Sequence, residues 1–296
     1  MATMTETPTL DMMTDVRRSQ LAETWKRLRK NKLALAGLIL LLFLVLVAIF
    51  ADLIAPYPFD KQNYDAVLQK PSWEHLMGTD EYGRDILSRV IHGSRISLRV
   101  GFISLTAGAL VGCILGAIAG YFGGRTDNLI MRANDILNGI PRIVLAIAIA
   151  SAFKPGLTSA LVAIAVSSVP NFARVVRAAT MTVRDQEYVE ASRSLGASHA
   201  RIIVSHIFPN ILAPIIVQAT LGIGTAILLC ASLSFLGLGV QPPIPEWGAM
   251  LSSARSFMRD YPYMVIAPGL AIMLTVLALN LFGDGLRDAL DPKLKK

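Results

Sequence analysis

Six long apolar runs divide the chain and predict six membrane-spanning helices. A hydrocarbon core about 30 Å thick needs about 20 predominantly apolar residues for each crossing. Runs of this kind occupy residues 33–54, 100–120, 130–153, 157–173, 210–236 and 263–282. The third run is interrupted by Asp135, Pro141 and Arg142. The pattern predicts an all-α integral membrane protein with six transmembrane helices.

A polar segment, residues 187–210, lies between the fourth and fifth apolar runs. Residues 187–195 are rich in Glu, Ala, Leu and Arg, which favour a short helix. Gly196 can end that helix with a positive φ. Residues 197–207 then predict a second helix, with Ser198 as its N-cap and Pro209 closing it. Two short helices at an angle would form a compact projection on the membrane surface, where a partner can dock.

Composition agrees with a membrane protein. Apolar residues make up 53% of the chain and the mean hydropathy is +0.53, both too high for an ordinary soluble domain. The first apolar run is too long for a cleaved signal peptide and lacks a small-residue cleavage site.

Positive charge predicts the orientation of the chain. The run 25–32 before the first span is strongly basic, and such runs stay in the cytoplasm. An even number of spans returns the C-terminus to the same side, and the 187–210 segment falls there too. The loop 55–99 is then extracytoplasmic. The basic residues that agree with this orientation are Arg177, Arg184, Arg193, Arg201, Arg287, Lys293, Lys295 and Lys296.

The net charge of +7 does not indicate a nucleic-acid partner. The positive residues lie at the ends of the spans, where topology and anionic lipid of the membrane account for them. Cys113 and Cys230 lie inside apolar runs and are expected to be buried small hydrophobes, neither disulfide partners nor metal ligands.

Catalytic and metal-binding patterns are missing from the sequence. It has no G-x-x-x-x-G-K-[ST] phosphate loop, so the chain is not expected to hydrolyse ATP by itself. It has no H-E-x-x-H and no C-x-x-C motif. None of His75, His92, His199 and His206 pairs with another histidine or an acid at ligand spacing, so each is expected at a surface or interface. We therefore predict no catalytic residue, no metal site and no cofactor in this chain.

Four glycines, Gly108, Gly112, Gly116 and Gly120, recur every fourth residue in the second span. On a helix they form a nearly straight stripe that lets another backbone approach closely. Tight packing within one bundle is the favoured interpretation, and a surface that slides or seals against a partner is the alternative.

Two charges interrupt the third span. Asp135 and Arg142 are seven positions apart and are expected on one face of a helix. Because charge inside a bilayer is costly, such residues usually face a bundle interior or a water-filled path. The alternative is that the helix starts in the cytoplasm and enters the hydrocarbon only near Ile143. Arg174 and Arg177, at the end of the fourth span, are expected to snorkel to the interface.

The two outer loops predict different structures. In the first, Thr79 or Asp80 is expected to cap a short helix that lies on the outer membrane surface. Its apolar face would consist of Ile86, Leu87, Val90 and Ile91. The second, residues 237–248, is rich in helix breakers, and a turn back toward the membrane anchored by Trp247 is expected.

These motifs together resemble an ATP-binding-cassette (ABC) importer permease, and more closely the C subunit of the dipeptide, oligopeptide and nickel permease family. The resemblance covers about residues 25–296. The family's E-A-A signature corresponds to Glu190-Ala191-Ser192, Gly196 and the tetrad 206–209, with departures at Ser192, His206 and Phe208. Further motifs of the same pattern are 78–80 with 83–85, 120–124, 241–248, 283–288 and 291–293.

The resemblance implies a type I ABC importer permease fold in the bacterial cytoplasmic (inner) membrane, with both termini cytoplasmic. The implied parts are a cytoplasmic segment 1–32, a first helix 33–54, an extracytoplasmic loop 55–99, a five-helix core 100–286 and a tail 287–296. Loop 184–209 within the core would form the coupling helices. The implied coupling residues are Glu187, Glu190, Ala191, Ser192, Leu195, Gly196, Ala197, Arg201, His206 and Pro209.

The same resemblance implies the partners and the cargo. A second permease subunit of the B type, two ATPase subunits that bind ATP and Mg, and an extracytoplasmic solute-binding protein would complete the importer. Dipeptides or short peptides are the expected cargo, with glutathione, nickel chelates and oligosaccharides as alternatives. A stand-alone secondary transporter is the rival class, but the chain shows no internal repeat that such a carrier would need.

Overall fold

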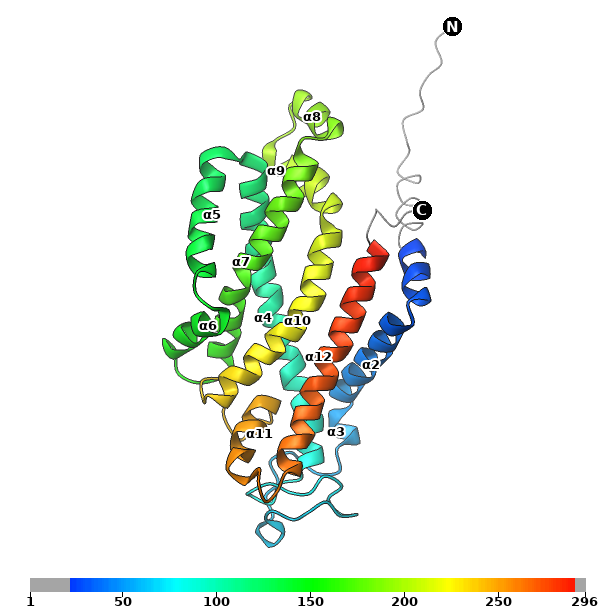
Figure 1. The fold of residues 1–296 in the computed structure, drawn as a ribbon, viewed down its shortest axis with the longest axis vertical. Helices are drawn as coiled ribbons and strands as arrows, with labels where there is room; N and C mark the ends of the chain where they lie inside the picture. Colours follow the sequence, from blue (N-terminus) through cyan, green and yellow to red (C-terminus); the bar gives the residue numbers. More distant parts are fainter. Residues whose placement is uncertain (1–21, 291–296) are drawn as a thin grey trace.

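The computed structural model describes residues 22–290, and these residues fold almost entirely into helices (Figure 1). Within this range the only β pairing is an isolated bridge between Thr79 and Asp85. The predictions made for residues 1–21 and for Lys293, Lys295, Lys296 and the 291–293 motif lie outside the described residues.

Five helices among the described residues are long and apolar enough to cross a membrane. They are α2 (Lys32–Ile49), α4 (Ile86–Phe122), α7 (Leu157–Arg184), α10 (Leu212–Phe235) and α12 (Tyr263–Leu290). The third predicted span is instead a bent pair, α5 (Gly124–Asn138) and α6 (Arg142–Ser151), with an angle of 88° between its two helices. Counting that pair as one crossing gives the six spans predicted from the sequence.

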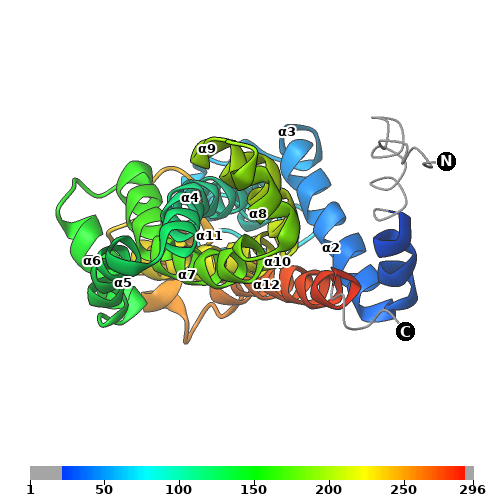
Figure 2. The same ribbon diagram turned by 90° about the horizontal axis from the view of Figure 1, so that it is seen from above.

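The bundle has α4 at its centre. Helix α4 packs along α7 on one side and contacts α10 and α2 on others, while α12 lies between α2 and α10 (Figure 1). Figure 2 shows α5 and α6 at one edge of the bundle and α2 at the opposite edge. Side chains of α2 such as Leu42 and Phe43 are exposed, as expected of a helix that faces lipid.

The glycine stripe of α4 lies directly against α7. A Cβ added at Gly112 would come 2.5 Å from Cβ of Phe172 and 2.7 Å from the carbonyl oxygen of Val169. The other three glycines face the α7 backbone in the same way, at Ala165, Ala173 and Arg177. The stripe is therefore a packing surface inside one bundle, the interpretation favoured from the sequence.

Helix α4 begins fourteen residues earlier than the predicted span, at Ile86 rather than residue 100. The expectation of an interfacial helix on the outer membrane surface is wrong. The stretch that begins at Ile86 is the first part of α4, and both Ile86 and Ile91 are buried in the protein. The cap is Asp85, whose carboxylate accepts a hydrogen bond from the Ser88 amide at 2.7 Å.

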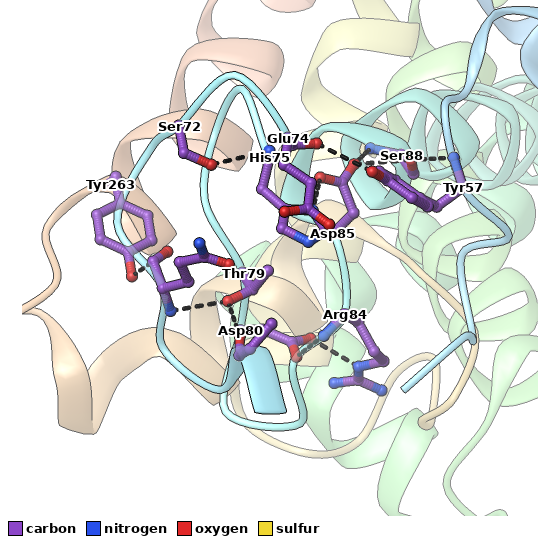
Figure 3. A network of polar contacts seen from close by, with 12 residues as sticks. Tyr57, Ser72, Glu74, His75, Thr79, Asp80, Arg84, Asp85, Ser88 and Tyr263 are labelled. Carbon is purple, nitrogen blue, oxygen red and sulfur yellow. Dashed lines mark hydrogen bonds and ion pairs between the residues drawn. The ribbon is translucent and has the colours of Figure 1, made fainter. Parts of the chain in front are cut away.

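Asp85 is fixed by a network of buried polar residues in the outer loop (Figure 3). Its other carboxylate oxygen lies 3.0 Å from Nδ1 of His75, which is 4% exposed. This histidine is therefore buried within the loop and paired with an acid, whereas a surface or interface position was expected. Asp80 is paired with Arg84 at 2.6 Å. A cap of this kind depends on residues that only the folded loop brings together.

The second outer loop leads into a short helix, α11 (Trp247–Ala254). Trp247 anchors it, as predicted, but inside the protein rather than at the membrane interface. The ring is 1% exposed and its N–H donates to the Val90 carbonyl at 3.0 Å. Glu246 is fully buried and caps α11 by accepting from the Ala249 amide at 2.9 Å.

The shorter helical pieces of the described chain include α3 (Ala51–Ile54), α8 (Glu187–Ser194) and α9 (His199–Ile202). Residues 22–30 are also helical, and single 3-10 turns occur at Tyr64–Ala66 and Arg255–Phe257.

Candidate functional site

The 187–210 segment forms two helical pieces joined by a tight turn at one end of the bundle (Figure 1). The first piece is α8, as the sequence predicts. Gly196 follows it with φ +79°, the left-handed conformation that a glycine tolerates and that ends a helix. Ser198 caps α9 by accepting from the Arg201 amide at 3.4 Å, also as predicted.

The second piece is less regular than predicted. Only α9 is α-helical; it continues as a π-helical turn Ile203–Ile207 and a 3-10 turn Phe208–Asn210. The π-helical turn ends at Ile207, the predicted end of the second helix, and Pro209 lies in the 3-10 turn that follows. Proline has no N–H to donate, so the α-helical ladder cannot continue through it, and a 3-10 turn takes its place.

One face of the segment is buried against the bundle. Val189, Ile202 and Ile207 are fully buried and belong to the same core cluster as side chains of α4, α7 and α10. His199 also forms a hydrogen bond with Tyr121 near the end of α4 at 2.8 Å. Burial of these aliphatic side chains fixes the segment to the transmembrane helices.

The opposite face of the segment is open. Leu195 is 88% exposed and Val204 is 65% exposed, which is unusual for large apolar side chains. Of the predicted coupling residues, six are exposed: Glu187, Glu190, Ala191, Leu195, Gly196 and Arg201. The other four are partly buried: Ser192, Ala197, His206 and Pro209. The segment thus presents a surface of mixed acidic, basic and apolar side chains.

Two departures from the E-A-A signature contact each other. The Ser192 hydroxyl and Nε2 of His206 form a hydrogen bond at 3.1 Å, across the turn between the two helical pieces. Phe208, the third departure, packs against the bundle core. An alanine at 192 could not make this bond.

Ion pairs join α7 to α5 near the same end of the bundle. Arg177 binds Asp127 through two bonds of 2.5 Å, and Arg174 binds Asp135 at 3.0 Å. These ion pairs were not predicted from the sequence, and the expectation that the two arginines snorkel to the interface stays a prediction. Asp127 was not predicted from the sequence, because its partner is 50 residues away in the chain.

Asp135 and Arg142 do not share a helical face, contrary to prediction. The chain bends between α5 and α6, so the two residues lie on different helices. Asp135 faces Arg174, whereas Arg142 donates to the Ser168 hydroxyl of α7 at 2.8 Å.

Within residues 22–290 no group of three or more His, Cys, Asp or Glu side chains is placed to hold a metal ion. Cys113 and Cys230 are free and buried, as the sequence predicts.

A bundle of apolar spans with an open helix pair at one end is typical of the membrane-spanning subunit of a transporter. The chain belongs to the family of binding-protein-dependent transport system inner membrane components, whose family model matches residues 112–296. Residues 19–71 match a second model, the N-terminal transmembrane domain of oligopeptide transport permease C. It is thus a multi-pass inner-membrane permease subunit of an ABC importer.

The chain is similar to curated permeases over most of its length. It is 52% identical to the dipeptide transport system permease protein DppC of Alkalihalophilus pseudofirmus, covering 92% of this chain and 90% of that protein. It is 46% identical to the glutathione transport system permease protein GsiD of Pectobacterium atrosepticum, covering 92% and 91%. A solved structure of the MetNI methionine ABC transporter, in inward-facing conformations, has a similar fold, with a TM-score of 0.57 and 20% identity over 70% of this chain and 98% of that one.

Proposed function

We propose that this chain is one of two permease subunits that together form the path for dipeptides and other short peptides. The observation that carries the proposal is the similarity to a dipeptide permease along 92% of the chain. The glutathione permease among the relatives transports a tripeptide thiol, so it points to the same chemical class of cargo. A solute-binding protein would deliver the peptide from the extracytoplasmic side.

In this proposal the 187–210 segment receives the motion of the ATPases. Its open face, with Glu187, Glu190 and Leu195, would seat in a groove of one ATPase subunit. Its buried face, with Val189 and Ile202, would pass a displacement to α7 and α10 as a rigid body. ATP and Mg would bind only to the two ATPase subunits, and this chain would have no catalytic role.

The positions of the first and last spanning helices support a cytoplasmic position for the 187–210 segment. The start of α2 and the end of α12 lie at the same end of the bundle as α8 (Figure 1). Basic residues of the 25–32 run lie before and at the start of α2, and the positive-inside rule favours the cytoplasm for such a run. Residues 1–32 and 287–296 would then be cytoplasmic, flanking the first helix, the outer loop that ends at Asp85 and the helical core that begins with α4.

The outer loop would face the solute-binding protein. Trp73 is 98% exposed there, on a turn held by hydrogen bonds between Ser72 and His75. Helix α4 has 37 residues and is about 55 Å long, whereas the hydrocarbon core is about 30 Å thick. At least one end of α4 therefore extends beyond the hydrocarbon core, and in this proposal the exposed Trp73 meets a soluble partner.

Reconstitution tests this function directly. The chain would be placed in lipid vesicles with its second permease and two ATPases, and the solute-binding protein added with labelled dipeptide. We expect ATP-dependent uptake, and ATP hydrolysis that rises when the binding protein is loaded. Binding protein without peptide is the control.

Two results would overturn the proposal. One is uptake by this chain alone, driven by an ion gradient without ATP, as a secondary transporter would show. The other is transport of a different cargo, such as a nickel chelate, with dipeptides neither transported nor competing.

A further inference from the structure

Arg142 is a cation in the transmembrane region without a carboxylate partner among residues 22–290. One terminal nitrogen donates to the Ser168 hydroxyl at 2.8 Å, and Nε is buried with no hydrogen-bond partner. Two arginines of the neighbouring α7, Arg174 and Arg177, each bind an aspartate of α5. Arg142 thus differs from them in having only a neutral partner.

Arg142 is partly buried, at the start of the edge helix α6 and level with the middle of α7. Its partner Ser168 lies near the middle of α7 and packs against Gly108, inside the apolar part of α4. A charge at this depth is costly, and such residues usually serve a transport path or an ion pair. A neutral hydroxyl does not balance the charge, so the site is incomplete without an anion.

Helix α6 begins at Arg142, directly after the 88° bend from α5. The positive end of the α6 dipole therefore adds to the charge of the guanidinium. The guanidinium offers five N–H donors in a planar fork that matches a carboxylate, and Ser168 occupies only one of them. The free guanidinium donors and the helix dipole together favour the binding of a small anionic group over a neutral one.

We infer that Arg142 binds the free C-terminal carboxylate of the peptide in transit. This inference rests on the proposed function, since it takes peptides as the cargo. Every unmodified dipeptide carries this group, whatever its side chains, and so does glutathione. A single arginine that binds the carboxylate would let one path accept many peptides and exclude neutral solutes.

Three variants of the complete importer test the inference. Arg142→Gln removes the charge, Arg142→Lys keeps it without the fork, and Arg132→Gln removes one charge from the exposed face of neighbouring α5 as the matched control. Uptake of a dipeptide is measured in vesicles with saturating loaded binding protein. Thermal unfolding of the detergent-solubilised complex is measured with excess dipeptide and with the same dipeptide amidated at its C-terminus.

We expect uptake to fall about tenfold or more in Arg142→Gln, the effect of losing a charge-assisted hydrogen bond, and less in Arg142→Lys. Arg132→Gln should transport like the wild type. Free dipeptide should raise the unfolding midpoint of the wild-type complex more than amidated dipeptide does, and this difference should vanish in Arg142→Gln.

Wild-type uptake in Arg142→Gln would overturn the inference and leave the proposed function intact. So would equal stabilisation of the wild-type complex by the two peptides together with a lower midpoint for peptide-free Arg142→Gln, because Arg142 would then pair with an acid of the second permease. Absence of peptide uptake by the wild-type importer would instead overturn the proposed function itself.

Discussion

Substitution of Gly116 by alanine should destabilise the permease through the contact between α4 and α7. The added Cβ would meet the carbonyl oxygen of Ala173, and it would lie 2.9 Å from Cβ of Val176 and 3.0 Å from the amide nitrogen of Arg177. All three atoms belong to the backbone or to a Cβ, so none can rotate away. Relief requires α7 to move as a whole.

The magnitude follows from two opposing effects. Forcing one extra carbon into a packed interior costs about 1–3 kcal/mol. Replacing glycine by alanine within a helix stabilises it by up to about 1 kcal/mol. The net expectation is a loss of about 1–2 kcal/mol, which corresponds to a fall of roughly 2–8 °C in the unfolding midpoint. Gly269→Ala in α12 is the matched control, because nothing lies within 4 Å of its Cβ, and it should be neutral or slightly stabilising.

The two native cysteines provide the assay. Cys113 and Cys230 are buried and free, so a thiol-reactive fluorophore labels them only when the purified permease unfolds. Labelling during a temperature ramp gives the midpoint for each variant. A Gly116→Ala midpoint equal to that of Gly269→Ala would refute the close approach of the two helices.

Three further predictions concern the turn, the ion pairs and the outer loop. Gly196→Val should leave the chain inserted in the membrane but lower ATP-driven uptake. The position is open, but a φ of +79° costs a branched residue about 1–2 kcal/mol. The measurement compares uptake with the amount of permease in the membrane. Asp127→Asn should lower the unfolding midpoint more than Asp135→Asn, because the pair of Asp127 with Arg177 has two bonds and is partly buried. The pair of Asp135 is exposed and contributes about 1 kcal/mol or less. Burial raises the pKa of Glu81 above its usual 4.5, so this group favours the folded state at low pH and that contribution is lost as pH rises through the raised value. Glu81→Gln should therefore be the more stable form at pH 7 and should lose part of the advantage at pH 4, as unfolding midpoints at the two pH values will show.

Each of these three predictions has its own contradicting result. Uptake at the wild-type rate in Gly196→Val would show that the turn does not need a left-handed residue. Equal midpoints for the two aspartate variants would show that burial does not separate the pairs. A pH-independent difference between Glu81→Gln and the wild type would remove the raised pKa as its cause.

The positions of the spans were predictable because hydrophobicity must be continuous wherever a helix crosses lipid. The glycine stripe likewise predicted close packing, since its spacing places all four on one helical face. Both features are encoded by neighbours in the sequence. The same holds for α8, for the turn at Gly196 and for the Ser198 cap, each of which depends on residues within one or two helical turns.

The features that were not predicted depend on distant residues. The start of α4 is set by Asp85, whose orientation is fixed by His75 in a folded loop. The pair of Asp127 with Arg177 spans two helices. The bend between α5 and α6 was visible as an interruption, but neither its angle nor the separation of Asp135 from Arg142 follows from a proline alone.

Cross-linking from the two exposed ends of the permease tests the central claim most directly. With Cys113 and Cys230 buried, a cysteine introduced at Leu195 or at Trp73 is the only accessible thiol among the described residues, and it can carry a photoactivatable group. In the assembled importer, position 195 should cross-link to an ATPase subunit, and position 73 should cross-link to the solute-binding protein. Two results would contradict the assignment of the 187–210 segment as the coupling surface. One is that position 195 does not cross-link to an ATPase in an importer that hydrolyses ATP. The other is that position 195 cross-links to the solute-binding protein.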